Sequence, residues 1–180
     1  MRKLPRLQPK VAGLFSIGYA TKAPDDFIAQ LKQYGIRAVA DVRSVPFSRA
    51  FADYHQDRLQ DLLRKHGIHY VYLGKELGPR SGDASHYDEN NQVLFDRLRQ
   101  SGAFRQGIDR LKLGLGKDMS IALLCAEKDP ANCHRSLLIA QDLLEGDSIE
   151  VQHIHHHGEL EGQRALLDRL VVEHGLDNNL

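Results

Sequence analysis

Apolar and polar positions follow two periods along this chain: short apolar runs alternate with longer stretches in which apolar residues recur every three or four positions. The short runs predict buried strands, and the longer stretches predict amphipathic helices. Such runs begin at Leu14, Ala38, Ile68, Ile121 and Val151. Strands that alternate with helices predict an α/β fold. We expect a three-layer, Rossmann-like, mostly parallel sheet with helices on both faces.

The pattern gives approximate bounds for each element. The predicted strands are 14–17, 38–42, 68–73, 121–125 and 151–154, the last of the chain; the predicted helices are 24–34, one around 59–63, 93–113 with an interruption near 101–102, 133–144, and 160–174. Gly35, Gly67 and Gly146 are predicted to end three of these helices. Residues 74–91 form a long polar loop, and such loops are often functional. Residues 1–12 are predicted to be a flexible tail, and 13–180 a single α/β domain.

Composition limits the possible partners. Lysine plus arginine equals aspartate plus glutamate at 24 each, so no global field attracts nucleic acid, and an anionic ligand would need a local cluster of cations. No stretch has the apolar length of a membrane span. Two cysteines are too few for a disulfide framework, so we expect a cytoplasmic protein in a reducing compartment. No cofactor is predicted, and the oligomeric state stays open.

Unusual polar residues follow the predicted strands. These residues are Gly18, Tyr19 and Thr21 after the first strand, Asp41, Arg43, Ser44 and Ser48 after the second, Gly74, Lys75, Glu76 and Arg80 after the third, and Cys125, Glu127, Cys133, His134 and Arg135 after the fourth. Parallel sheets bind ligands at the carboxyl ends of their strands. We therefore expect one site built from four loops.

Three of these residues are candidates for catalysis. Asp41 and Glu127 are carboxylates at predicted neighbouring strand ends, a pairing that serves acid–base chemistry or cleavage of glycosidic bonds. Cys133 lies at a predicted helix start beside His134 and Arg135, and this setting favours a thiolate. The alternative for the cysteines is a pair of unrelated buried thiols.

The other residues are candidates for ligand binding. They are Gly18, Tyr19, Thr21, Arg43, Ser44, Ser48, Cys125, His134 and Arg135. Each of the two arginines could bind a phosphate or carboxylate group in bidentate fashion, or pair internally with Asp41 or Glu127. Tyr19 could stack on a base, although a tyrosine ring half buried in the core is commoner.

Two groups of residues are candidates for metal binding. Cys125, Cys133 and His134 offer soft ligands, but their spacing is not that of a zinc finger, and adjacent Cys-His residues seldom share one ion. We therefore assign no metal ligand from the sequence. The histidines of 153–157 also suggest metal, and a solvated surface cluster explains them equally well.

Three motifs in order resemble a known family. The chain carries Ile17-Gly18-Tyr19-Ala20-Thr21, then Asp41-Val42-Arg43-Ser44-Val45-Pro46-Phe47-Ser48, and then Cys125-Ala126-Glu127 followed by Cys133-His134-Arg135. This set resembles domain-of-unknown-function family 488 (DUF488), a prokaryotic family, over about residues 15–154. The resemblance implies a three-layer α/β fold and no established reaction.

Three functions remain open at this stage. The first is an enzyme that acts on a nucleotide, a nucleoside or an anionic substrate derived from nucleic acid. The second is a thiol enzyme with Cys133 as nucleophile, although the glycine-rich loop between cysteine and arginine that typifies thiol phosphatases is absent. The third is a non-catalytic sensor that binds an anion or a nucleotide.

Overall fold

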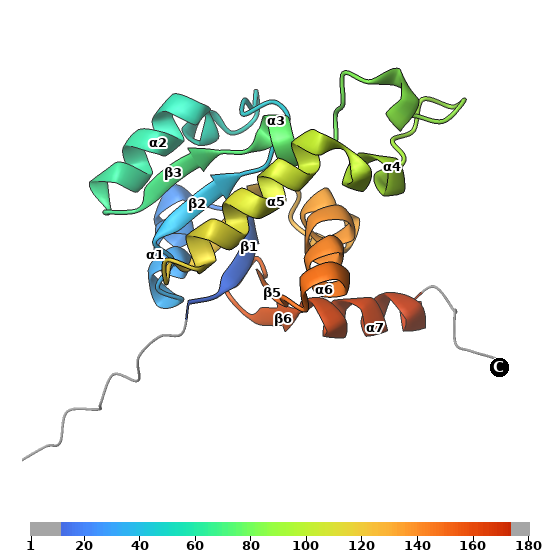
Figure 1. Ribbon diagram of the computed structural model, residues 1–180. Coiled ribbons are helices and arrows are strands. Elements are labelled where there is room, and N and C mark those ends of the chain that lie inside the picture. The colour runs from blue at the N-terminus through green and yellow to red at the C-terminus, as the bar shows by residue number, and fades with distance from the viewer. Residues whose placement is uncertain (1–11, 174–180) are drawn as a thin grey trace, which may run out of the picture.

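The computed structural model describes residues 12–173 and contains one six-stranded sheet (Figure 1). The strands are β1 Leu14–Gly18, β2 Ala38–Asp41, β3 His69–Tyr72, β4 Ile121–Cys125, β5 Val151–Ile154 and β6 Leu160–Gly162, in the order β3-β2-β4-β1-β5-β6. Neighbouring strands from β3 to β5 are parallel, and β6 is antiparallel to β5. The predicted α/β fold with a mostly parallel sheet is confirmed. The predicted tail lies, except for residue 12, outside the described residues, as does residue 174.

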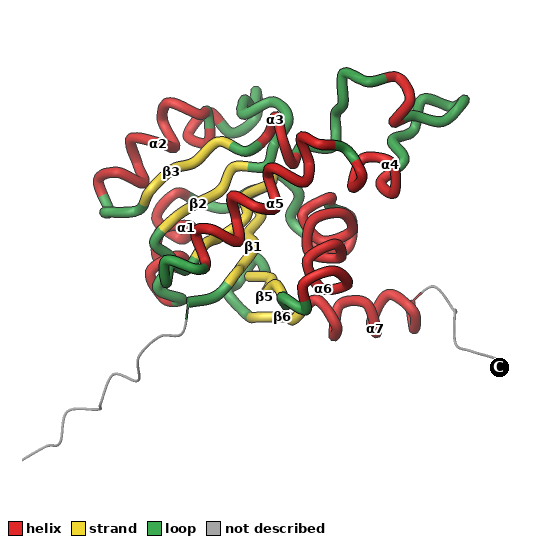
Figure 2. Tube along the Cα trace, in the orientation of Figure 1, coloured by secondary structure: helices red, strands yellow, loops and turns green. Residues whose placement is uncertain are grey.

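Helices cover both faces of the sheet (Figures 1 and 2). They are α1 Pro24–Gln33, α2 Gln56–Lys65, α3 Gly74–Leu77, α4 Phe95–Gln100, α5 Gly102–Leu115, α6 Gln141–Asp147 and α7 Gln163–Glu173. Phe27 of α1 and Leu63 of α2 pack with Val39 and Leu124 in one core. A second core, against the opposite face, contains residues of α5 and α6 such as Leu111 and Leu143. Within the described residues, no helix is long and apolar enough to cross a membrane.

Several element boundaries follow from local chemistry. Gly35 and Gly67 adopt positive φ angles of 62° and 70° directly after the first two helices, as their predicted role as helix stops requires. The expected interruption near 101–102 is a helix cap, because the Ser101 hydroxyl accepts a hydrogen bond from the Phe104 amide at 3.2 Å. The chain therefore enters α5 at a defined residue.

The helix predicted over 133–144 is built differently. A 3₁₀ turn at Pro130–Asn132 precedes it, a π-helical segment covers Arg135–Ala140, and α6 continues to Asp147. The prediction that Gly146 ends this helix is wrong, since Gly146 lies inside α6 and the left-handed residue is Ser148, with φ 56°. Helical spacing alone does not distinguish π from α hydrogen bonding, because both present similar apolar faces.

Two further elements differ from the predicted pattern. Residues 160–162, expected to begin the closing helix, form β6 and pair with β5, so β5 is not the last strand. The long loop after β3 contains α3 and a 3₁₀ turn at Ala84–His86. Both elements are short, and pairing along a sheet edge depends on tertiary contacts that a local pattern does not record.

Candidate functional site

A cleft of about 300 Å³ lies at the carboxyl edge of the sheet. Its lining residues come from the loops after β1, β2, β3 and β4: Tyr19, Arg43, Ser44, Val45, Phe47, Pro79, Arg80, Cys125, Ala126, Glu127 and His134. Six of the residues selected from the sequence are therefore on its wall, namely Tyr19, Arg43, Ser44, Cys125, Glu127 and His134. The others lie behind the wall or away from it.

The strand register explains why the loops after β1 and β4 converge. Gly18 pairs with Cys125 at the ends of these strands, and the Tyr19 amide donates to the Cys125 carbonyl at 3.2 Å. A Cβ atom on Gly18 would lie 1.9 Å from the Glu127 carbonyl oxygen. Gly18 therefore serves close backbone approach, which positions Glu127, and its expected role as a direct ligand contact is not needed to explain it.

Asp41 holds Arg43 in place. The Arg43 guanidinium donates from Nε to Asp41 Oδ1 at 2.8 Å and from Nη2 to Oδ2 at 2.6 Å, and Nη1 donates to the Tyr54 carbonyl at 2.9 Å. Tyr70 donates a further hydrogen bond to Asp41, which is fully buried. Burial opposes the Arg43 charge, but the bonded carboxylate outweighs it and raises the pKa of Arg43. Asp41 thus has no free access to the cleft and is not placed for acid–base chemistry.

Tyr19 lies at the junction of core and cleft. Its ring is 2% exposed and stacks on Tyr54, with centroids 4.4 Å apart. The Arg43 guanidinium carbon lies 5.1 Å from the Tyr19 ring centroid, within the range of a cation–π contact. Tyr19 is therefore a core residue to a greater extent than the half-buried ring expected from the sequence, and its ring also contacts Arg43.

Arg135 does not line the cleft, contrary to the expected role in anion binding. Its side chain is fully buried, and it donates to the Glu127 carbonyl at 2.8 Å, the Ser16 hydroxyl at 3.2 Å and the Lys128 carbonyl at 3.4 Å. These bonds tie the loop after β4 to β1. Because the guanidinium is enclosed by protein acceptors, Arg135 supports the site from behind.

Thr21 and Ser48, two further expected ligand-binding residues, also lie outside the cleft lining. Thr21 is exposed in a turn with φ 60°. The Ser48 hydroxyl accepts a hydrogen bond from the Phe51 amide at 3.2 Å, which organises the loop after β2. Neither of these two residues therefore belongs to the cleft wall.

Four side chains form a compact cluster at the base of the cleft: Cys125, Glu127, Cys133 and His134. Cys125 Sγ lies 2.6 Å from Glu127 Oε2, and Cys133 Sγ lies 3.1 Å from the same oxygen. His134 Nδ1 lies 3.6 Å from Cys125 Sγ and 3.9 Å from Cys133 Sγ. Cys133 is 2% exposed and is not on the cleft wall, whereas Cys125 is on it.

The two thiols differ in acidity because their surroundings differ. Burial opposes ionisation of Cys133, but the hydrogen bond from Cys125 and the charge of Arg135 lower its pKa to about 5. The hydrogen bond to Cys133, together with burial, raises the pKa of Cys125 well above its ordinary value. For Glu127, burial is outweighed by hydrogen bonds from both thiols, so the pKa of this carboxyl is lowered.

Some residues that line the cleft were not predicted from the sequence. Val45, Phe47, Pro79 and Ala126 were not selected, and Arg80 was noted only as a residue after the third strand. The signal for Arg80 was its place in the long polar loop. That loop reaches the cleft because the Arg80 amide donates to the Ser44 hydroxyl at 3.0 Å.

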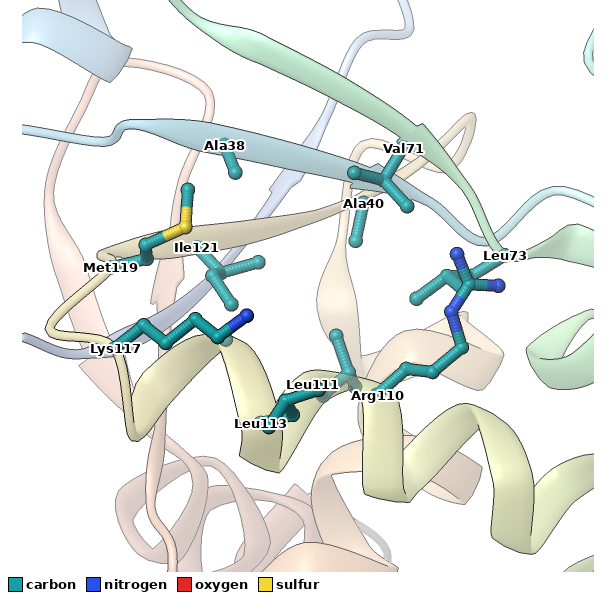
Figure 3. A pocket seen from close by; sticks show the side chains of 11 residues that line it. Ala38, Ala40, Val71, Leu73, Arg110, Leu111, Leu113, Lys117, Met119 and Ile121 are labelled. Atoms are coloured by element: carbon teal, nitrogen blue, oxygen red, sulfur yellow. The ribbon is translucent and has the colours of Figure 1, made fainter.

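The histidine run and a second cavity lie elsewhere. His153 is fully buried and bonded to Ser16 and Gln163, so it does not belong to a solvated surface cluster. A cavity of about 230 Å³ lies between α5 and the strands β2, β3 and β4 (Figure 3). Its lining is mainly apolar, with Arg110 and Lys117 as its charged residues. Its lining contains no thiol, imidazole or carboxylate group.

Comparison with known proteins gives one match. No curated protein and no solved structure matches the chain. The sequence model of one family, described as domain of unknown function DUF488, matches residues 23–141, which is more than half of the chain. The motifs around Asp41 and Cys125 fall inside this span, and the turn at Ile17-Gly18-Tyr19 falls outside it. The chain, with its cleft at the carboxyl edge of the sheet, therefore belongs to the DUF488 family.

Proposed function

We propose that this protein is an enzyme whose cleft binds a small anionic substrate with a planar ring, of the nucleotide or nucleoside class or derived from nucleic acid. The observation that carries the proposal is an exposed guanidinium, that of Arg80, on the wall of the same cleft as the cluster of thiol, imidazole and carboxylate groups. A cation beside reactive groups can hold an anionic substrate in contact with the groups that react with it.

The charge around the cleft supports an anion at Arg80. The positive charge of Arg43 is balanced by Asp41 in a buried pair, with Nη2 and Oδ2 2.6 Å apart. Arg80 forms no salt bridge within residues 12–173. Glu127 is the only carboxylate among the residues that line the cleft. An incoming phosphate or carboxylate would therefore pair with Arg80.

The apolar part of the wall supports a ring. Phe47 is 56% exposed and stacks on His55, with ring centroids 4.2 Å apart, and Val45 and Pro79 are further apolar residues of the lining. Exposed aromatic faces bind flat heterocycles, and arginine side chains stack on them too. The volume of about 300 Å³ is at the lower end of small-molecule sites, which fits a mononucleotide or a smaller fragment.

Glu127 is the side chain best placed for acid–base chemistry. Glu127 is exposed on the cleft wall, whereas Asp41 is buried behind Arg43. The two carboxylates therefore do not form a pair on either side of a substrate bond. The alternative thiol mechanism with Cys133 is less favoured, because Cys133 lies beneath the wall with 2% exposure. A sensor with the same cleft would bind the ligand and release it unchanged, which a turnover assay distinguishes.

Titration calorimetry with inorganic phosphate, ribose 5-phosphate, nucleosides and nucleoside monophosphates tests the proposal. Arg80→Ala should weaken binding of phosphorylated ligands by about 1.5–3 kcal/mol, the range for hydrogen bonds to charged groups. Arg37→Ala, an exposed arginine at the opposite end of β2, is the matched control and should bind as the parent does.

Product analysis on the ligand that binds should show turnover by the parent and none by Glu127→Gln, which should keep its affinity. If no anion binds, or if Arg80→Ala binds as tightly as the parent, the proposed substrate class is wrong. Binding without turnover by the parent would identify a sensor.

A further inference from the structure

Four potential metal ligands converge at the base of the cleft. The sulfur atoms of Cys125 and Cys133, the Nδ1 atom of His134 and the carboxylate of Glu127 all lie within 4.8 Å of one another. The first three belong to buried residues, and Glu127 is exposed toward solvent. Two thiols, an imidazole and a carboxylate are the ligands that zinc takes in proteins.

The orientation of His134 suits a metal ligand. Its Nε2 atom lies 3.0 Å from the Val42 carbonyl oxygen, which can only accept, so the ring proton is on Nε2. Nδ1 then carries a lone pair directed to the side where the two sulfur atoms lie, 3.6 and 3.9 Å away. A backbone carbonyl that fixes the tautomer and plane of a histidine is the usual outer contact of a metal-bound imidazole.

The spacing of these atoms is close to that which tetrahedral zinc requires. With Zn–S bonds of about 2.3 Å and Zn–N bonds of about 2.0–2.1 Å, neighbouring ligand atoms lie roughly 3.5–3.8 Å apart. The nitrogen–sulfur distance to Cys125, 3.6 Å, already has this length, and the distance to Cys133, 3.9 Å, would shorten slightly. Glu127 Oε2 is closer to the sulfur atoms, at 2.6 and 3.1 Å, so it would withdraw by roughly 0.5–1 Å to take the same spacing. An exposed glutamate can make that movement.

We propose that Cys125, Cys133 and His134 bind one zinc ion, with Glu127 or a water molecule as the fourth ligand on the cleft side. Both sulfur atoms bind as thiolates, and a proton still held by either thiol passes to solvent as the metal binds. The buried guanidinium of Arg135, which contributes positive charge at Cys133, partly balances the resulting negative cluster. The inference revises the sequence-based assignment of no metal, because the fold turns Cys125 back onto the adjacent Cys133-His134 pair.

This inference goes beyond the proposed function and does not depend on it, because metal binding is measured without any organic ligand. If nucleotides fail to bind, the metal site still stands, and a failed metal site leaves the anion cleft unchanged. A fourth position shared by Glu127 and water would be open to the cleft, as in zinc sites that act on substrates.

The test uses reduced, tag-free protein from which metal has been removed with a chelator. Titration with zinc against a competing colorimetric chelator should give one equivalent per chain. Cys133→Ser and His134→Ala should each lose affinity by at least about tenfold, and Glu127→Ala, on an exposed side chain, should lose a smaller factor. His157→Ala is the control for surface histidines and should bind as the parent does.

Two measurements on the parent protein keep the proposal testable if a variant with a buried substitution fails to fold. Cobalt(II) should give a thiolate charge-transfer band together with the intense visible bands of a tetrahedral site. One equivalent of zinc should protect both cysteines from alkylation. Absence of stoichiometric zinc, cobalt spectra without a thiolate band, unprotected cysteines, or loss of binding in His157→Ala would each overturn the proposal.

Discussion

His153 is the centre of a buried polar network that joins β5 to its surroundings. It accepts a hydrogen bond at Nδ1 from the Ser16 hydroxyl at 2.6 Å, and its Nε2 donates to Gln163 Oε1 at 2.7 Å. Ser16 also accepts from Arg135 Nε, so its own proton is available for His153. Every polar group in this network has a hydrogen-bond partner when His153 is neutral.

The network predicts a dependence of stability on pH. Burial is the main cause that lowers the pKa of His153 to about 4; the bond to Gln163 opposes it, and the charge of Arg135 assists it. An unfolded chain with the ordinary pKa of about 6.5 binds the proton first, so stability is full above that value and falls as pH drops toward 4. Between pH 7.5 and 5 this group should remove about 2 kcal/mol from the free energy of unfolding.

Urea unfolding of the parent protein and of His153→Gln at both pH values measures this contribution. The variant should be less stable at pH 7.5 and should show a smaller loss at pH 5, because glutamine does not titrate. Equal losses in the two proteins would show that His153 does not titrate in the predicted range.

Three arginines show which residue roles the sequence could predict. Arg43, Arg80 and Arg135 all follow strands, so their place at one edge of the sheet was predictable. The pairing of Arg43 with Asp41 was among the predicted alternatives. The enclosure of Arg135 was not, because its acceptor Ser16 comes from a distant segment. Only Arg80 stays exposed on the cleft wall. Partners far along the chain cannot be read from local spacing.

At the scale of elements, the site depends on backbones that approach closely between loops. A Cβ atom on Gly74 would lie 1.9 Å from the Arg43 carbonyl oxygen, and one on Gly78 would lie 2.3 Å from the Gly74 carbonyl oxygen. Gly18 makes the same kind of contact with Glu127. The loops after β1, β2, β3 and β4 can therefore meet only where side chains are absent.

Substitution of Gly18 tests this dependence. Gly18→Ala should lower the free energy of unfolding by about 1–3 kcal/mol or more, because the loop that carries Glu127 must move to remove the overlap. It should also weaken any ligand that binds in the cleft. Gly146→Ala is the control, since a Cβ there meets nothing within 4 Å, and in the helix α6 it should stabilise by about 0.5–1 kcal/mol.

Chemical denaturation of both variants, with ligand titration of Gly18→Ala, gives the readout. A Gly18→Ala protein as stable as the parent would mean that the loop accommodates the methyl group without cost.

The two glycines also differ in how well the sequence predicted their roles. Gly146 was expected to end a helix and does not, whereas Gly18 was identified from its position at a strand end.

The elements that the sequence predicted well are those whose burial pattern is strong. β4 is buried at all five positions, and β2 at all four, so their apolar runs were clear. β6 has exposed and half-buried residues and pairs only at the edge of the sheet, so its pattern resembled the start of the helix that follows. The four-residue helix α3 was hidden in a loop for a similar reason.

At the scale of the whole molecule, one sheet separates two cores. The first is formed with α1 and α2 and contains Leu63, and the second is formed with α5 and α6 and contains Leu111. The sheet strands contribute alternate residues to the two cores, as Leu124 and Leu123 do from β4. The layered fold could be predicted because alternating elements leave few topologies. The cluster of potential metal ligands could not be predicted, because it depends on how tightly the turn after β4 folds back.

The expected single domain predicts that the two cores unfold together. Leu63→Ala and Leu111→Ala each remove a side chain that is at most 2% exposed, so each should cost about 2–5 kcal/mol. The sites lie on opposite faces of the sheet, so their costs should add within about 0.5 kcal/mol in the double variant. Urea unfolding should be followed by far-ultraviolet circular dichroism and by tyrosine fluorescence, to which Tyr19 and Tyr54 contribute from the α1–α2 side.

In a single cooperative unit, Leu111→Ala shifts both transitions to the same lower urea concentration, although it lies on the face opposite Tyr19 and Tyr54. The shared sheet is the physical reason, since loss of either helical layer exposes strands that the other layer needs. If the fluorescence transition of Leu111→Ala stayed where it is in the parent while the circular dichroism transition moved, the two layers would unfold separately, and the chain would contain two folding units.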